Sequence, residues 1–178
     1  MSIESRGIAW GRVFEYPGSG SAQSYCYQQT KRHHVKRNSS MNIRRAVQSD
    51  VSRMMEIRHL VRENRLSDPN LVTADHCAEF IERSEMWVWE DEGVVQAFAA
   101  GDIRDGWIWA LFVAPGYEGR GIGQSLLSMA CETLRTAGYS IANLSTAAGT
   151  RAERFYRENG WTVASKNGRG KLLFYKEL

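Results

Sequence analysis

The order of hydrophobic and polar residues predicts a strand, a turn and a helix in the middle of the chain. Residues 108–113 are a short, nearly all-apolar run, as expected of a buried strand. Pro115 ends this run, and four glycines follow at positions 116, 119, 121 and 123. Gly138 is a typical helix terminator, so the helix that follows is predicted to end there. The apolar residues of this helix share one face, at Ile122, Leu126, Leu127, Ala130 and Leu134.

The same patterns divide the rest of the chain, from position 42 onward, into short strands and helices. Asp50 and Thr73 are the predicted N-caps of the first two helices. Elements in this order predict one mixed α/β sheet in a single domain of residues 41–178. The further strands are predicted at 42–46, 86–89, 94–101, 140–145, 161–165 and 171–175, and the further helices at 51–61, 73–84 and 150–158.

Residues 1–40 have a different composition. A Gly-Ser-Gly-Ser segment at 18–21 resembles a linker, and the segment shows no clear hydrophobic periodicity. It holds six of the 23 Lys and Arg residues and two of the 20 acidic residues, so it carries a charge of +4 and the rest of the chain −1. We expect an N-terminal extension that is disordered or weakly ordered. Its basic run at 31–37 suits nucleic acid or an acidic surface, but the near-neutral remainder argues against a nucleic-acid-binding domain.

The totals fit one folded domain of 178 residues, with 43% hydrophobic and 24% charged residues. No apolar run reaches the ~18 residues that a membrane span needs, and no secretory signal is visible at the N-terminus. Cys26, Cys77 and Cys131 are an odd number at wide spacings, which indicates a reducing compartment rather than a disulfide framework. A cytoplasmic location without membrane contact is therefore expected. No Cys/His cluster has the spacing of metal ligands, so no metal is expected.

A glycine-rich turn that leads into a helix leaves backbone N–H groups available for a phosphate or pyrophosphate. Three nucleotide-binding motifs do not match here. A P-loop requires Gly-Lys-Ser/Thr where this chain has Gly123-Gln124, and a dinucleotide fingerprint requires G-x-G-x-x-G with an acidic residue about 20 positions later. A protein-kinase glycine loop requires a lysine strand and a catalytic loop. The turn alone is compatible with anion binding or with a tight connection.

Two segments resemble the GNAT superfamily of N-acetyltransferases. Residues 118–123, Glu-Gly-Arg-Gly-Ile-Gly, are similar to the family's acetyl-CoA signature Gln/Arg-x-x-Gly-x-Gly/Ala, and residues 152–161 are similar to its A-x-x-F-Y-x-x-x-G-F/W segment. The resemblance covers the chain from Met41 to the end. It implies a mixed, mostly antiparallel central sheet flanked by helices, and transfer of an acetyl group from acetyl-CoA to a primary amine of a small molecule or peptide. Homodimers are common in the family.

Two positions depart from the family's pattern. Glu118 stands where the family has Gln or Arg, so phosphate binding would depend on backbone N–H groups and Arg120. Gly149 stands where many relatives have an Asn that contacts the pantetheine arm. With the lack of a carboxylate in strand 108–113, these departures keep open a second function, that of a non-catalytic acyl-CoA-binding sensor or regulatory module.

The resemblance also implies roles for individual residues. Tyr156 would be the general acid that protonates the departing thiolate. Asp102, Asp105 or a chain of water molecules would remove the amine proton. Tryptophans near the acceptor could form an aromatic wall, although their spacing is also typical of a core. The residues implied for acetyl-CoA binding are Leu111, Phe112, Val113, Gly119, Arg120, Gly121, Ile122 and Gly123, and those for the acceptor are Glu63, Asn64, Trp87 and Trp109.

Overall fold

The computed structural model describes residues 42–61, 73–167 and 170–178. The expected extension at 1–40 lies outside the described residues. The helices are α1 (Val51–Leu60), α2 (Ala74–Glu82), α3 (Ile122–Thr136) and α4 (Arg151–Glu158), and a 3-10 turn at Gln48–Asp50 precedes α1. The strands are β1 (Ile43–Arg45), β2 (Met86–Asp91), β3 (Val94–Asp102), β4 (Trp107–Val113), β5 (Ile141–Ala147), β6 (Thr162–Lys166) and β7 (Lys171–Glu177).

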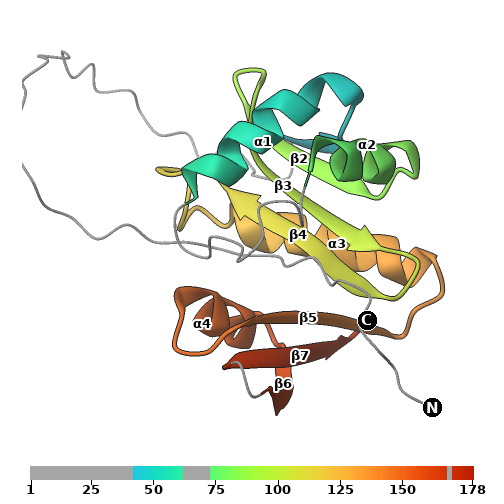
Figure 1. Cartoon of the computed structure of the whole chain (residues 1–178), viewed down its shortest axis with the longest axis vertical. Helices are drawn as coiled ribbons and strands as arrows, with labels where there is room; N and C mark the ends of the chain where they lie inside the picture. Colours follow the sequence, from blue (N-terminus) through green and yellow to red (C-terminus); the bar gives the residue numbers. More distant parts are fainter. Residues whose placement is uncertain (1–41, 62–72, 168–169) are drawn as a thin grey trace, which may run out of the picture.

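The strands form one mixed sheet in the order β1-β2-β3-β4-β5-β7-β6 (Figure 1). Neighbouring strands are antiparallel except β4 and β5, which run parallel. The predicted mostly antiparallel sheet flanked by helices is confirmed, and so is the order of its elements. The predicted ends of the strands lie within two residues of the observed ones, because turn residues mark nearly every boundary.

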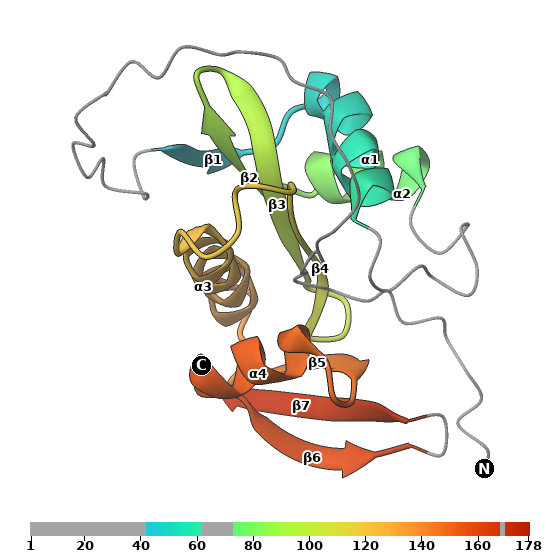
Figure 2. The ribbon, with the colours of Figure 1, turned by 90° about the vertical axis from the view of Figure 1, so that its left-hand side faces the viewer.

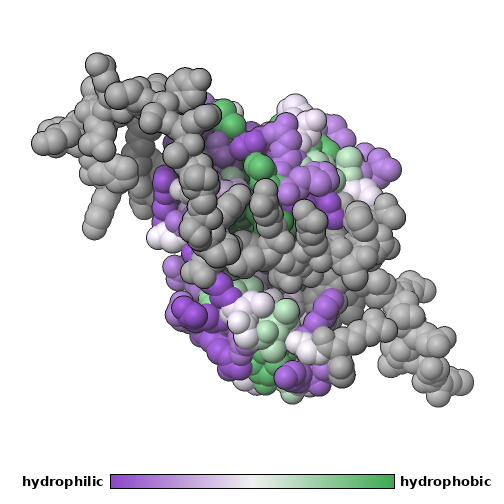
Figure 3. Space-filling view, turned by 60° about the vertical axis from the view of Figure 1, so that its left-hand side comes forward, coloured by the Kyte–Doolittle hydropathy of each residue, from purple (hydrophilic) through white to green (hydrophobic). Residues whose placement is uncertain are grey.

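Helices cover both faces of the sheet (Figure 2). On one face α1 and α2 pack over β2, β3 and β4, around Met54, Ile57 and Phe80. On the other face lie α3 and α4, and all five predicted apolar positions of α3 are buried there. On the face shown in Figure 3, most of the coloured residues are hydrophilic. Within the described residues, no helix combines the length and the apolar character that a membrane crossing requires.

The two predicted N-caps have different outcomes. The Thr73 hydroxyl accepts a hydrogen bond from the His76 N–H at 3.2 Å and caps α2 as predicted. The prediction for Asp50 was wrong, because this residue has helical backbone angles (φ −79°, ψ −19°) and does not cap α1. Its carboxylate instead accepts from the Val47 N–H at 2.8 Å and pairs with Arg44 at 2.7 Å. The 3-10 turn before α1 is the cause, since an N-cap residue needs extended backbone angles.

The parallel strands β4 and β5 are paired at one end only. The ladder joins Trp107 to Asn143, whose N–H donates to the Gly106 carbonyl oxygen at 3.0 Å. Beyond this pair the two strands separate, while β5 stays paired with β7 along its length (Figure 1). The opening between residues 108–113 of β4 and residues 144–147 of β5 is called the fork below.

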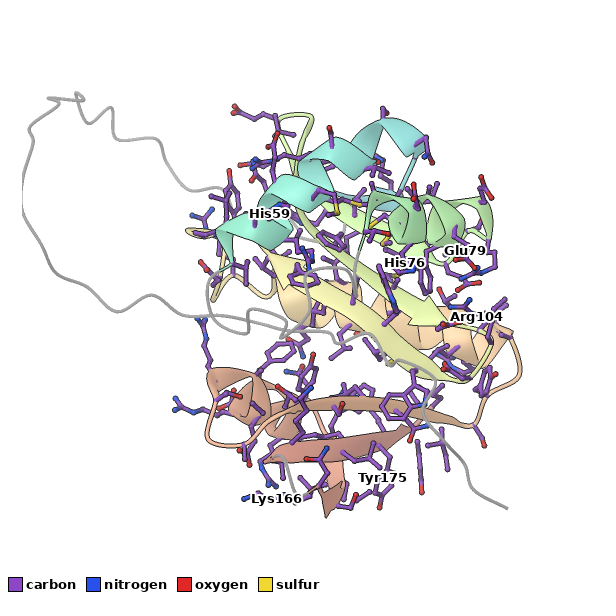
Figure 4. All side chains as sticks on the ribbon, in the orientation of Figure 1. His59, His76, Glu79, Arg104, Lys166 and Tyr175 are labelled. Atoms are coloured by element: carbon purple, nitrogen blue, oxygen red, sulfur yellow. The ribbon has the colours of Figure 1, made fainter. Side chains whose placement is uncertain are left out.

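A group of ion pairs lies where the fork is closed, between α2 and the β3–β4 turn. Arg104 pairs with Asp102 at 2.6 Å and with Glu79 at 3.1 Å. The side chains of Arg104 and Glu79 lie close together in Figure 4. Arg83 pairs with Glu79 and with the buried Glu85. Burial alone raises the pKa of the Asp102 carboxyl, but hydrogen bonds from Arg104 outweigh it and hold the pKa below its ordinary value of 3.8.

Acid should destabilise the protein through Asp102. A carboxylate whose pKa is lowered by folding contributes stability above its unfolded-state pKa, and this contribution is lost as the pH falls through the folded-state pKa. We therefore expect the free energy of unfolding, measured with urea, to decrease between about pH 5 and about pH 3, and to decrease less in Asp102→Asn. Asp75→Asn, on the exposed first turn of α2, is the matched control. Wild-type pH dependence in Asp102→Asn would contradict the prediction.

Candidate functional site

The turn between β4 and α3 has backbone angles that favour glycine. Gly116, Gly119 and Gly121 have φ angles of 86°, 70° and 80°, where a residue with a side chain is strained. Gly121 is the N-cap residue of α3. The first N–H groups of a helix have no partner inside it and point out of its N-terminus. The turn is therefore shaped to present backbone N–H groups to an anion.

Tyr117 holds this turn against the β2–β3 hairpin. Its hydroxyl donates to Asp91 Oδ2 at 3.2 Å, and its ring centroid lies 5.8 Å from that of Trp89. The guanidinium of Arg120 lies over the Tyr117 ring at 4.8 Å and donates to the Gly116 carbonyl oxygen at 2.7 Å. Arg120 is thus bound back onto the turn, and its side chain is not part of the pocket beside it.

A pocket of about 340 Å³ lies between the glycine turn and α4. Gly119 and Gly121 line it from the turn, and Gly123 from the start of α3. Arg151, Arg154 and Phe155 line it from α4. The two arginines are not among the site residues predicted from the sequence. Their spacing of three residues on a helix predicted at 150–158 puts both on the same side of that helix, and this was the available signal.

The lining of this pocket carries both signs of charge. Besides two arginines it includes Glu118 and Glu158. Glu118 Oε2 accepts a hydrogen bond from the Gly116 N–H at 2.7 Å. One N–H donor of the turn is therefore already bound to a carboxylate of the chain. A carboxylate at this place also opposes the binding of a phosphate.

The start of α4 is fixed by hydrogen bonds in a second glycine turn. Gly149 has a φ of 75°, and its N–H donates to Glu153 Oε2 at 2.7 Å. The Thr150 hydroxyl accepts from the Glu153 N–H at 3.2 Å, as an N-cap does. The hydrogen bond from Gly149 lowers the pKa of the Glu153 carboxyl. These bonds set the direction of α4 and hence the position of the two pocket arginines.

The register of β4 decides which of its backbone groups point into the fork. The Ala114 N–H donates to the carbonyl oxygen of Gln96 in β3 at 2.7 Å. Backbone groups alternate in direction along an antiparallel strand. Those of Phe112 are therefore directed toward β3, and those of Leu111 and Val113 toward the fork. Of the three strand residues predicted to orient the pantetheine arm, Phe112 does not have suitably directed backbone groups.

Tyr156 lies inside the domain, with 0% of its surface exposed. Its ring centroid is 5.3 Å from that of Phe155, 6.0 Å from that of Trp161 and 5.9 Å from that of Phe174. It belongs to the cluster that α3 and α4 form with side chains of β4 and β5. Of the two adjacent aromatic residues of α4, Phe155 lines the open pocket and Tyr156 packs between the helix and the sheet.

The predicted acceptor residues are not brought together. Trp109 is buried on the α1–α2 face and stacks on Phe80, with 4.2 Å between the centroids. Trp87 packs on the opposite face, where its Nε1 donates to Thr133 at 2.9 Å. The expectation that both line one pocket is corrected, because the pairing of the strands turns their side chains to opposite faces of the sheet. The other two, at positions 63 and 64 (Glu63 and Asn64), lie outside the described residues.

The two aspartates considered as bases lie where the fork is closed. Asp102 is held by Arg104, as described above. Asp105 accepts from the Trp107 N–H at 3.2 Å, and burial, followed by the charge of Asp102, raises its pKa. Both residues precede β4, so the whole length of that strand separates them from the glycine turn.

The described cysteines are buried thiols. Burial raises the pKa of Cys77 and of Cys131 to about 11, so neither is a thiolate at neutral pH. Across residues 42–61, 73–167 and 170–178, no group of three or more His, Cys, Asp or Glu side chains is placed to hold a metal ion.

Solved structures with this fold are numerous. At a TM-score of 0.67, the chain is similar to a PaiA N-acetyltransferase from Thermoplasma acidophilum in complex with coenzyme A (17% identity, 76% of this chain and 98% of that one). It is also similar to a ribosomal-protein-alanine N-acetyltransferase from Brucella melitensis (23% identity, 76% of this chain and 99% of that one, TM-score 0.61). A third similar structure is that of YncA from Salmonella typhimurium with its cofactor acetyl-CoA (23% identity, 76% of this chain and 92% of that one, TM-score 0.62). At these identities the likeness establishes the fold.

The family follows from the sequence match. No curated protein matches the chain. Residues 51–161 match the model of the acetyltransferase (GNAT) family. This range runs from the start of α1 to Trp161 and contains the glycine turn, the pocket and Tyr156. Since the match covers more than half of the chain and the fold agrees with it, the protein belongs to the GNAT family of acetyltransferases.

Proposed function

We propose that this acetyltransferase moves the acetyl group of acetyl-CoA to a primary amine of a small molecule or a peptide. The observation that carries the proposal is that Val113, at the open end of the fork, lines the pocket together with the glycine turn. Buried backbone N–H and C=O groups need partners, and an extended amide chain pairs with a strand edge as another strand would. The pantetheine arm is such a chain, with phosphates at one end that suit the turn.

The residues divide the binding of acetyl-CoA among them. Backbone N–H groups of residues 119–123 bind the pyrophosphate, and Leu111 and Val113 pair with the arm in the fork. Arg151 and Arg154 supply the positive charge, since both line the pocket. Arg120 acts indirectly, by bracing the turn through the Gly116 carbonyl oxygen. Gly119, Gly121, Gly123 and Ile122 therefore keep the binding role predicted for them. The backbone of Phe112 has no role in this proposal, because it is directed toward β3.

Tyr156 is the group that gives a proton to the departing thiolate. A phenol has a reference pKa of about 10 and a thiol about 8.5, so the phenol is protonated at neutral pH and can donate. Its position beneath α4, beside the strands of the fork, excludes bulk water from the reacting sulfur. Strand β4 has no carboxylate, so the amine proton leaves through water.

The test of this function uses the full chain and two readouts. Acetyl-CoA at 100 times its Kd should stabilise the protein by about 2.7 kcal/mol in thermal denaturation. Thiol release should then require both acetyl-CoA and an amine from a panel of small amines and peptides. ATP is the control for nonspecific binding of phosphates. Stabilisation without thiol release for any amine would favour the sensor function, and no stabilisation at millimolar acetyl-CoA would refute both.

Glu118→Gln should tighten the binding of acetyl-CoA. Glutamine keeps an oxygen for the Gly116 N–H and removes a negative charge from the pocket. Two unit charges about 4 Å apart in water interact by about 1 kcal/mol, so we expect about fivefold lower Kd by calorimetry at low salt, and a smaller difference at high salt. Glu82→Gln, exposed on α2, is the matched control. An unchanged or higher Kd for Glu118→Gln would show that the carboxylate does not oppose the phosphates.

Tyr156→Phe should lower kcat far more than it raises the KM for acetyl-CoA. The phenylalanine keeps the ring contacts with Trp161 and Phe174 and removes only the proton donor. Loss of a general acid lowers kcat on the order of 100-fold. Tyr175→Phe, on β7 outside the pocket, is the matched control in steady-state kinetics. If Tyr156→Phe keeps the wild-type kcat, Tyr156 has no part in the mechanism.

A further inference from the structure

Two adjacent residues of β5 bury hydroxyl groups that have no hydrogen-bond partner in the described part of the chain. Ser145 is 6% exposed and Thr146 is 2% exposed. Neither Oγ of Ser145 nor Oγ1 of Thr146 is hydrogen-bonded within that part. Burying a hydroxyl without a partner costs free energy, so such a group in a native protein calls for an explanation.

The two hydroxyls lie on opposite faces of the sheet. Successive side chains of a strand alternate between faces. Ala142 and Leu144 belong to the cluster beneath α3 and α4, and so does Leu172, which is opposite Thr146 in β7. Thr146 is therefore on the face of α4, where Tyr156 is buried. Ser145 is on the other face, which is the face that α1 and α2 cover over β2 to β4.

Both residues lie beyond the point where β5 separates from β4. The last residue of β5 that pairs with β4 is Asn143, two positions before Ser145. The pocket and the glycine turn approach the fork from the side of α3 and α4. An acceptor that reacts with a thioester held there would have to come from the opposite face, because α3 and α4 cover the first one.

We propose that these hydroxyls are binding groups for the two reactants, Thr146 for the thioester end of acetyl-CoA and Ser145 for the acceptor amine. This rests on the proposed function. The Thr146 hydroxyl hydrogen-bonds the acyl thioester beside Tyr156. The Ser145 oxygen accepts a hydrogen bond from the amine on the opposite face and orients its nitrogen toward the fork. Each hydroxyl gains its missing partner only when the reactant is bound.

The test compares Thr146→Val, Thr146→Ser and Ser145→Ala with matched controls on the exposed strand β6, Thr162→Val and Ser165→Ala. Loss of one hydrogen bond should raise a KM by about three- to tenfold. For Thr146→Val we expect this increase in the KM for acetyl-CoA, with recovery in Thr146→Ser. For Ser145→Ala we expect it in the KM for the amine alone. The controls should keep wild-type constants.

Thermal denaturation of the free proteins separates this role from a structural one. Removing a hydroxyl that has no partner breaks no hydrogen bond, so Tm should stay unchanged or rise in Thr146→Val and Ser145→Ala. A lower Tm in both variants, or KM values within twofold of the wild type, would overturn the proposal. A wild-type protein that acetyl-CoA does not stabilise would overturn the proposed function itself. An active wild type with unaffected variants would overturn the hydroxyl assignment alone.

Discussion

The structure depends on how far two parallel strands can remain paired. β4 and β5 share one ladder position, Trp107 with Asn143, and then separate. Each half of the sheet has its own helix on the same face. α3 lies so close to β3 that a Cβ atom on Gly101 would be 2.7 Å from the Ala130 carbonyl oxygen, while α4 packs on β5. The fork lies between these two assemblies, and its free strand edge needs hydrogen-bond partners that the described strands do not supply.

The candidate site joins the two halves of the domain. The glycine turn belongs to the N-terminal half, because Tyr117 ties it to Asp91 in the β2–β3 hairpin. The pocket arginines belong to the C-terminal half, because the Gly149 turn fixes the start of α4. A ligand in the pocket and the fork therefore contacts elements that fold onto different parts of the sheet. Its binding energy would link those halves as well as position its reactive end.

Charge is used differently at the two ends of the fork. Where the fork is closed, Asp102 and Glu85 are buried with arginine partners, which satisfies carboxylates that would otherwise be costly to bury. Beside the open end, two arginines and two glutamates share a pocket lining. Balanced charge would limit the electrostatic attraction for phosphates, and for this reason we propose backbone N–H groups as their main binding groups. The family's acetyl-CoA signature is defined mainly by glycine positions, which is consistent with such a site.

The elements, their order and the glycine turn follow from local patterns in the amino-acid sequence. Hydrophobic spacing, as on α3, and turn residues such as Gly138 act over a few positions, so these features are local. Which aromatic side chain meets a pocket was decided by tertiary structure alone. Trp87 and Trp109 are equally hydrophobic, but strand pairing placed them on opposite faces, and packing against the sheet buried Tyr156 rather than Phe155. Register and helix position depend on contacts between distant residues, and a local pattern does not contain them.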